Sequence, residues 1–327
     1  MEKVIQMANE LFGRYADVYV SGPIYAAHFN MANLYIEFEV EFDDDSKPNI
    51  STVSIYNLSS TSRSRIVKGA NIAITAGYRK DGTGVILQGK ITGVTNNKEG
   101  VDRITKISVK EGQDYSHIKI DTSTADAAVK YQVKKRVKLK KPVVTYTKTK
   151  TGKKKKKTIS YRTVTETKYK KRAMKKSFGK NTRSSTIIRW CARTLGMKIT
   201  TLSLPTDKIY KKGYTITGSI ETKMEEVVKN CGAVMYYRRG NMVIRSIKVG
   251  NDERFTLSAA TGLLDSPEQS EDDDGKKIYT VRSLLQYRIA TASIIYINSK
   301  TVKGTFRVKS GKHICNGSDF ITELVVF

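Results

Sequence analysis

The positive charge of this 327-residue chain is gathered into one segment, and that segregation limits what each part of the chain can fold into. The formal net charge is +28. Residues 130–183 hold 23 lysines and arginines but one acidic residue, Glu166, whereas charges in the rest of the chain nearly balance. A segment so basic, with few apolar residues, cannot form its own hydrophobic core. The rest of the chain is expected to fold as an ordinary, mildly basic globular protein.

The length and the motif content narrow the class of protein further. At about 100–200 residues per domain, the chain is expected to form two or three domains. No apolar run of about 18 residues predicts a membrane-spanning helix, and the N-terminus lacks the apolar core of a secretory signal. Cys191, Cys231 and Cys315 are too widely spaced for a zinc motif. We therefore expect cytoplasmic synthesis, reduced buried thiols and no membrane insertion.

Alternating apolar residues in the first third of the chain predict antiparallel strands. From Leu34 to Phe42 every second residue is apolar with polar or aromatic residues between, as in a strand with one buried face. About six strands are expected in residues 17–112, as a compact barrel or a split sandwich. The helical spacing of apolar residues over 4–15 predicts a short amphipathic N-terminal helix. The other main strands are expected at 52–56, 71–78, 84–94 and 103–110.

The basic segment allows two interpretations. Eight threonines lie between 145 and 167, and tyrosines occur among them; both residue types favour extended chain. The segment is therefore compatible with a long two-stranded arm that has Thr151-Gly152 at its tip. Disorder is the other interpretation, because an isolated hairpin is only marginally stable in water.

A mixed helix–strand region follows the basic segment. Residues 184–199 and 219–245 each predict a helix, a terminating glycine and a strand. Cys191 and Cys231 fall on the apolar faces of the two helices, so both are predicted to be buried, free core thiols.

The last part of the chain returns to strand patterns. Residues 259–277 predict a polar, acidic linker, and 278–327 predict a second barrel-like domain. The expected fold class is a β-rich α+β chain with two β-barrel domains flanking a mixed α/β middle region and a basic extended insertion. The predicted divisions are 1–115 for the N-terminal barrel with its helix, 116–183 for the insertion, 184–258 for the middle domain and 259–327 for the C-terminal domain.

The sequence contains no recognisable catalytic or cofactor-binding motif. His28, His117 and His313 have no partner at a metal-binding or catalytic spacing, and the glycine-rich phosphate-binding and nucleophile motifs are absent. Asp43–Asp45 is interpreted as a solvated turn, because no further ligand spacing follows it. We expect no enzymatic activity, no cofactor and no metal.

The lysine run in the basic segment is the candidate binding site. Its charge suits phosphate, an anionic wall polymer or an acidic protein face; the other interpretation is a solvated loop without a partner. Tyr146, Tyr161 and Tyr169 could stack on nucleic-acid bases, but they suit a strand equally well, so specific nucleic-acid binding is not favoured. The predicted contact residues are Lys153, Lys154, Lys155, Lys156, Lys157, Lys170, Lys171 and Arg172.

The order of these patterns resembles a known family. The residues that carry the resemblance are Val53–Ser59, Arg63–Ile66, Lys68-Gly69, Ile72–Tyr78, Ile86–Val94, 184–199, 219–245, Tyr279–Leu285, Gly304–Val308, His313 and Phe320–Thr322. The N-terminal stretch among them resembles the barrel of the baseplate hub family of contractile phage tails, which includes the late control D-type and PBSX-like hub proteins. The helix–glycine–strand units resemble the family's middle domain, and the end of the chain resembles its closing strands. The family pattern does not require the basic segment.

This resemblance implies a structural protein rather than an enzyme. Family members form a homotrimeric ring in which two tail-tube-like barrels per subunit meet the hexameric tail tube, while the other face holds the central spike. The implied partners are the tube protein, the spike protein and other baseplate proteins, and nucleic acid would only pass through the lumen. The chain would be made in the bacterial cytoplasm and assembled into the tail of a phage or of a tail-like bacteriocin (a tailocin), both contractile injection systems.

Two other classes of protein stay open at this point. A polyanion-binding protein, for nucleic acid or a wall polymer, is suggested by the basic segment. A cell-wall-degrading or wall-binding tail protein is suggested by Tyr214–Ile244, which is loosely similar to peptidoglycan-binding repeats.

Overall fold

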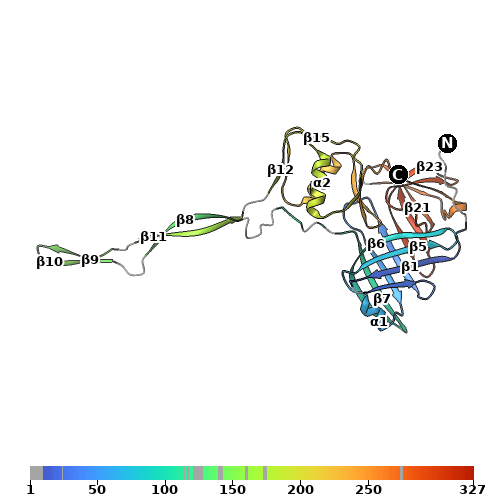
Figure 1. Cartoon of the computed structure of the whole chain (residues 1–327), viewed down its shortest axis with the longest axis horizontal. Coiled ribbons are helices and arrows are strands. Elements are labelled where there is room, and N and C mark those ends of the chain that lie inside the picture. The colour runs from blue at the N-terminus through green and yellow to red at the C-terminus, as the bar shows by residue number, and fades with distance from the viewer. Residues whose placement is uncertain are drawn as a thin grey trace.

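The structure is a computed structural model that describes residues 10–23, 25–113, 115, 118–120, 128–138, 143–158, 161–171, 175–272 and 275–327. It shows a β-rich body from which two-stranded ribbons extend to one side (Figure 1). The β-rich character predicted from the sequence is confirmed.

One sheet of 13 strands joins the beginning and the end of the chain. The seam is the antiparallel pair β3–β23, in which Phe42 lies opposite Gly311 and Phe38 opposite Cys315. Strand β22 (Ser293–Asn298) pairs with β23 and, in parallel, with β19 (Asn251–Ser258). From edge to edge the main path is β2 (Ala26–Asn30), β1 (Arg14–Ser21), β5 (Asn71–Tyr78), β6 (Gly82–Glu99), β7 (Asp102–Glu111), β4 (Ile50–Tyr56), β3 (Ile36–Phe42), β23 (Lys303–Cys315), β24 (Phe320–Val326), β21 (Lys277–Leu284) and β20 (Glu268–Glu271).

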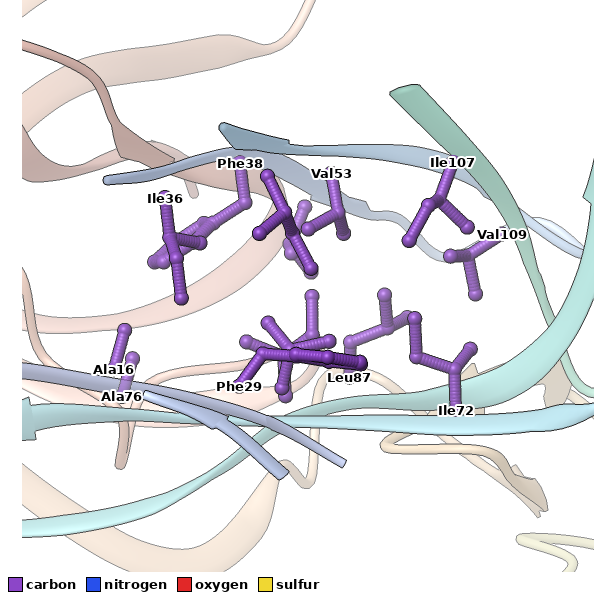
Figure 2. Packing of buried hydrophobic residues seen from close by; sticks show 14 of the residues in the cluster. Ala16, Phe29, Ile36, Phe38, Val53, Ile72, Ala76, Leu87, Ile107 and Val109 are labelled. Atoms are coloured by element: carbon purple, nitrogen blue, oxygen red, sulfur yellow. The ribbon is translucent and has the colours of Figure 1, made fainter. Parts of the chain in front are cut away.

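The N-terminal half of this sheet curls around a single apolar core. Strand β3 buries its four apolar residues and leaves its glutamates at least partly exposed, as its alternation predicts. Figure 2 shows the two facing layers, with Phe38, Val53 and Ile107 on one side and Ala76 and Leu87 on the other. The short helix α1 (Ser60–Arg65) caps this half and begins after Ser59, whose Oγ accepts a hydrogen bond from the Ser62 N–H.

The N-terminal helix expected over 4–15 is wrong for the residues that can be compared. Residues 10–13 are not helical, Gly13 has a left-handed φ of 73°, and β1 begins at Arg14. Strand pairing with β5 and β2 outweighs the local helical spacing, because β1 buries Ala16, Val18 and Val20 in the core. The rest of that prediction lies outside the described residues.

The C-terminal half of the sheet has a separate core. Phe255, Leu257, Val281, Ile295 and Val326 are among its members, and Phe42 reaches it from β3 across the seam. Strand pairing leaves β2 and β20 at the two ends of the main path, so the described strands do not close into a barrel. The two-barrel arrangement therefore stays a prediction.

The middle region packs two helices against a three-stranded sheet. Helix α2 (Ser184–Leu195) ends at Gly196, which is left-handed, and helix α3 (Ile220–Lys229) begins after Ser219, which caps it. Their apolar faces share one core with the sheet. The sheet consists of β14 (Ile199–Leu202), β18 (Asn241–Arg245) and β17 (Val234–Arg238).

Two details of this region test the sequence predictions. Cys191 and Cys231 are buried free thiols, as predicted, and so is Cys315. The sequence predicts Ser184 or Ser185 as the cap of α2, and this prediction is wrong. Arg183 precedes the helix, and the carboxylate of Asp207 accepts hydrogen bonds from the N–H and Oγ of Ser185, each 2.8 Å long. A residue 22 positions away in sequence thus supplies the cap.

The strand pairs cross the predicted domain boundaries, and the domain division itself stays a prediction. Residues 176–183 pair with the middle region rather than with the insertion, and β19 pairs with the C-terminal strand β22. A short 3-10 helix, η2 (Ala259–Thr261), follows β19. The small pairs are β12 (Lys176–Phe178) with β16 (Tyr214–Ile216) and β13 (Thr182–Arg183) with β15 (Ile209–Tyr210).

Candidate interaction surfaces

The basic segment contains two antiparallel ribbons. Strand β8 (Ala128–Lys138) pairs with β11 (Tyr161–Lys171), and β9 (Val143–Thr149) pairs with β10 (Gly152–Thr158). The two-stranded interpretation is confirmed for these residues, with the turn at Lys150-Thr151. At a rise of about 3.3 Å per residue, the ribbons of 11 and 7 residues span about 36 and 23 Å. Figure 1 shows both extending away from the body.

The register of the ribbons keeps like charges apart. Every basic residue of β8 and β11 stands opposite an uncharged residue; Lys134 faces Thr165 and Lys168 faces Tyr131, for example. In the β9–β10 pair the one exception is Lys148 opposite Lys153. Like charges directly opposite each other destabilise a strand pair, so this register lets a densely basic sequence form a ribbon.

The predicted contact residues lie at two separate places in the ribbons. Lys153–Lys157 all belong to β10, next to the turn. Lys170 and Lys171 end β11, opposite the beginning of β8, and Arg172 lies outside the described residues. The structure therefore does not bring these groups together, and their role as contacts stays a prediction.

The β17–β18 hairpin of the middle region contacts both the N-terminal and the C-terminal half of the large sheet. Between β17 and β18, the Gly240 N–H donates a 2.8 Å hydrogen bond to Oε1 of Glu111 in β7. The neighbouring Arg239 donates from Nη2 to the carbonyls of Tyr287 at 2.8 Å and Arg288 at 3.0 Å. The strand patterns of Ala233–Tyr237 and Met242–Arg245 predict a hairpin here, and the structure confirms it, but they do not predict its place at the junction. The sequence signal for the junction is Arg238-Arg239-Gly240. Local patterns do not distinguish this buried turn from an ordinary turn on the surface.

Two buried titratable groups lie at the same junction. Burial raises the pKa of Glu111 to about 7, against the effect of the Gly240 hydrogen bond. Arg288 forms an ion pair with Asp81 across the interface of the N- and C-terminal halves, with Nη1 2.7 Å from Oδ2. Asp81 is almost fully buried, so removing either partner would leave a desolvated charge.

Two hollows border this hairpin. A cleft of about 510 Å³ separates β1 and β6 from the middle region and is lined by Tyr19, Lys90, Tyr115 and Lys198, among others. A second hollow of about 420 Å³ lies on the other side of β18. Its lining comprises Thr200, Thr201, Arg238, Arg239, Asn241, Val243, Arg245 and Asn251.

The histidines show no catalytic arrangement in the described part of the chain. His28 is exposed and its Nδ1 lies 2.8 Å from Oδ2 of Asp17. His313 is fully buried in the seam; its Nδ1 hydrogen-bonds with Thr322 Oγ1 at 2.8 Å, and burial, with Arg239, lowers its pKa to about 3. His117 lies outside the described residues. No cluster of three or more His, Cys, Asp or Glu in the ranges given above is arranged to hold a metal ion.

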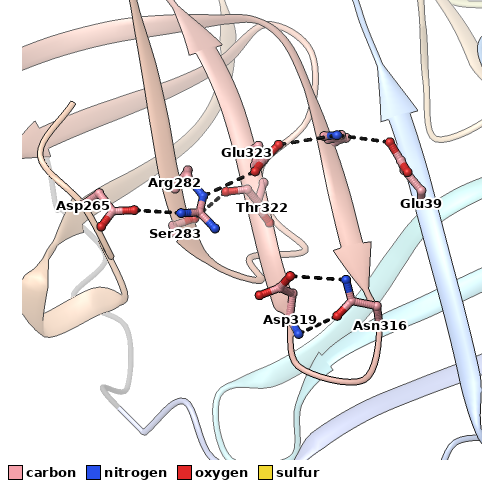
Figure 3. Close-up of polar contacts among 9 residues, drawn as sticks. Glu39, Asp265, Arg282, Ser283, Asn316, Asp319, Thr322 and Glu323 are labelled. Carbon is pink, nitrogen blue, oxygen red and sulfur yellow. Dashed lines mark hydrogen bonds and ion pairs between the residues drawn. The ribbon is translucent and has the colours of Figure 1, made fainter. Parts of the chain in front are cut away.

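Ion pairs cross the outer face of the seam. Figure 3 shows Arg282 between Asp265 at 3.1 Å and Glu323 at 3.3 Å. Lys312 lies between Glu323 and Glu39, and so joins β24, β23 and β3. Because these groups are partly exposed, each pair contributes at most about 1 kcal/mol and chiefly helps to fix the strand register.

Solved structures of two tail proteins have a similar architecture. A 43 kDa tail protein of prophage MuSo2 from Shewanella oneidensis has 6% sequence identity and a TM-score of 0.57, over 95% of this chain and 97% of that one. A tail protein from Neisseria meningitidis MC58 has 8% identity and a TM-score of 0.56, over 96% of each chain. The chain has the fold of phage tail proteins.

A third solved structure with a similar fold belongs to a secretion system. It is an E. coli component of the type VI secretion system, described as structurally similar to tail proteins of bacteriophage T4. It has 8% identity and a TM-score of 0.52, over 95% of this chain and 76% of that one. No family model and no curated protein matches the sequence. Within the described ranges, no helix is both long and apolar enough to cross a bilayer.

Proposed function

We propose that this chain is a non-enzymatic structural component of a phage tail or a related contractile injection apparatus. The observation that carries the proposal is the extent of the structural match: two tail proteins are matched over 95% or more of both chains. The agreement therefore includes the N-terminal half, the middle region and the C-terminal half together.

Within the tail, we assign the chain to the baseplate hub, as a homotrimer between the tail tube and the central spike. The sheet supports this, because each of its halves curls around its own core and gives one chain two β-rich lobes. Three chains with two similar lobes each would offer six contacts to a hexameric tube. On this proposal the lobes are the two tube-like barrels, closed by neighbouring subunits at the open edges β2 and β20.

The basic ribbons are proposed to contact an acidic face of a neighbouring tail protein. Their support is the charge of the segment and a register that separates like charges. The contacts assigned to them are the eight basic residues predicted from the sequence, from Lys153 to Arg172.

Co-expression with the tube and spike proteins of the same tail tests the assembly role. Native mass spectrometry should give a trimer of this chain, and negative-stain images should show that ring between tube and spike. A chain that stays monomeric with both neighbours present would contradict the hub assignment.

The basic segment favours one alternative function, polyanion binding. Duplex DNA bound by the isolated chain at 0.15 M salt, with affinity falling steeply as salt rises, would support it. A trimer that binds no DNA under those conditions would exclude it.

A further inference from the structure

The β8–β11 ribbon has two faces of different composition. Residues directly opposite each other in an antiparallel pair share a face, and successive residues of a strand alternate between faces. By this rule the four valines of the two strands all belong to one face, the valine face, and the three threonines all belong to the other, the threonine face. The opposed pairs of the valine face are Val129 with Lys170, Tyr131 with Lys168, Val133 with Glu166, Lys135 with Val164 and Val137 with Arg162.

Strand propensity alone does not explain this division. Valine and threonine both favour extended chain, so a ribbon that needed only to form could carry threonine on both faces. Valine on one face only is instead typical of a strand that buries that face against another layer. Among the described strands none pairs with β8 or β11 apart from these two with each other, and Figure 1 shows the ribbon standing clear of the body. The described part of the chain therefore does not supply that layer.

The valine face is charged along its whole length. Each of its opposed pairs joins one valine or tyrosine to one charged residue, and four of the five charged residues are basic. The apolar residues follow mainly β8 and the charged residues mainly β11, so the face is divided lengthwise into an apolar row and a basic row. A complementary surface must offer apolar groups beside carboxylates.

This arrangement favours an acidic protein over two other occupants. A second copy of the ribbon would set nine basic residues and one acidic residue against the same set, and the two would repel each other. A lipid surface binds elements whose apolar and charged faces are separate, whereas here a charged residue stands opposite each apolar one on the same face. An acidic protein can match both rows at once.

The second ribbon repeats the pattern over a shorter length. Val144 stands opposite Lys157 and Tyr146 opposite Lys155, so both of these pairs lie on one face of the β9–β10 ribbon. The threonines of β9 fall on the other face. The same combination of apolar residue and lysine thus recurs in both ribbons of the basic segment.

We propose that this chain docks on an acidic tail protein through the valine face of the β8–β11 ribbon, with the apolar row buried and the basic row paired with carboxylates. The inference rests on the proposed contact between the basic ribbons and a neighbouring tail protein, and it names the face that makes the contact. An attraction that depended on net charge alone would use both faces equally. Docking through the valine face is sensitive to uncharged substitutions on that face only.

Binding of the full-length chain to each purified tube, spike and baseplate protein of the same tail, measured by biolayer interferometry in 0.15 M NaCl, tests the proposal. The double variant Val133→Thr/Val137→Thr keeps the charge and the strand propensity of the ribbon. It should weaken binding by about tenfold or more, because it places two hydroxyls in a buried apolar row. An affinity equal to that of the parent would overturn the proposal.

The matched control makes the reverse exchange on the threonine face. Thr163→Val/Thr165→Val adds apolar groups without changing the charge, and it should alter the affinity by less than about twofold, because that face stays outside the contact. A change as large as that caused by Val133→Thr/Val137→Thr would show that the two faces do not differ, and would overturn the proposal as well.

A second pair of variants compares the basic residues of the two faces. Arg162→Gln/Lys168→Gln removes two positive charges from the valine face, and Lys134→Gln/Arg136→Gln removes two from the threonine face. Long-range attraction falls to a similar extent in both, so a larger loss from the first variant reports direct pairing with carboxylates. We expect a loss of about tenfold against about twofold. Equal losses would show that net charge alone drives the contact.

Failure of this inference is distinguishable from failure of the proposed ribbon contact. If replacing residues 128–171 with a Gly-Ser linker leaves binding to every tail protein unchanged, the ribbon contact itself is wrong. If that replacement abolishes binding and Val133→Thr/Val137→Thr does not weaken it, only the choice of face is wrong. Flotation with phosphatidylglycerol vesicles, or self-association in sedimentation velocity, that the same double variant abolishes would assign the face to lipid or to a second copy and overturn the protein partner.

Discussion

Glu111 is a carboxyl group buried between β7 and the turn of the β17–β18 hairpin, and its titration should make the stability of the fold depend on pH. Burial raises its pKa from 4.5 to about 7, so the folded chain holds this proton more tightly than the unfolded chain. Its stabilising contribution is therefore complete below about pH 4.5 and is lost as the pH rises through 7.

Replacing Glu111 with Gln tests this directly. The amide cannot ionise and still offers Gly240 an acceptor, so the variant should be more stable than the parent by about 3 kcal/mol at pH 8 and by no more than about 1 kcal/mol at pH 5. Urea unfolding at the two pH values measures the difference. Glu99 is an exposed carboxylate on β6, the strand that forms a hairpin with β7. Glu99→Gln is therefore the control, and it should leave the free energy of unfolding unchanged at both pH values. An identical effect of Glu111→Gln at both pH values would contradict the assignment of the pKa.

The thiols give a second prediction for single residues. Cys191, Cys231 and Cys315 are buried, and burial raises the pKa of Cys191 and Cys315 to about 12. Since the thiolate is the reactive form, an aromatic disulfide reagent at pH 8 should label all three about 100-fold more slowly in the native chain than in urea. Rapid labelling of any of them in the native chain would show that its helix or strand opens readily.

The turn between β17 and β18 tests how closely separate elements pack. Gly240 has a φ of 80°, and a Cβ there would lie 2.6 Å from the carbonyl oxygen of Gln88. Gly100, at the tip of the β6–β7 hairpin, has a similar φ of 58° but nothing within 4 Å. Gly240→Ala should therefore cost about 3 kcal/mol, from backbone strain plus a clash, and Gly100→Ala about 1 kcal/mol from strain alone. Equal losses in urea unfolding would mean that the middle region can move away from β6.

Elements with a strong local pattern could be predicted from the sequence, whereas those decided by distant partners could not. Strand β3 and helix α2 were predicted because alternation and helical spacing are visible within about ten residues. The seam between β3 and β23 was not predicted, because it joins residues more than 260 positions apart and leaves no local signature. Strand β1 was missed in part for the same reason: its pairing with β5 overrides a helical spacing.

Among the candidate sites, too, those with a local sequence pattern could be predicted and those formed by distant segments could not. The lysine run and its hairpin tip can be read from the sequence, and the pairing of β9 with β10 bears the hairpin out. The arginine-lined hollow could not be predicted, because its lining comes from three segments that meet only in the folded chain. In the sequence, Arg238, Arg239 and Arg245 look like ordinary charged residues of a strand hairpin.

At the scale of the whole molecule, the question is whether the basic ribbons serve folding or assembly. In the described structure each ribbon pairs only within itself, and the sheets of the body contain none of their strands. Ala128 lies opposite Lys171 at the base of the β8–β11 pair, so a short linker can bridge these two positions. Replacing residues 128–171 with a short Gly-Ser linker should therefore leave the core intact and shift the thermal unfolding midpoint by no more than about 2 °C.

The same replacement should impair assembly. Dense like charge favours an extended ribbon until an acidic surface neutralises it, and this attraction weakens as salt is added. The full-length chain should therefore co-purify with its tail partners more strongly at 50 mM than at 500 mM NaCl, and the shortened chain should lose most of this salt dependence. A shortened chain that assembles as well as its parent at every salt concentration would rule out a docking role for the ribbons. One that fails to fold would show instead that residues 128–171 belong to the core, and the proposed separation of insertion and body would be wrong.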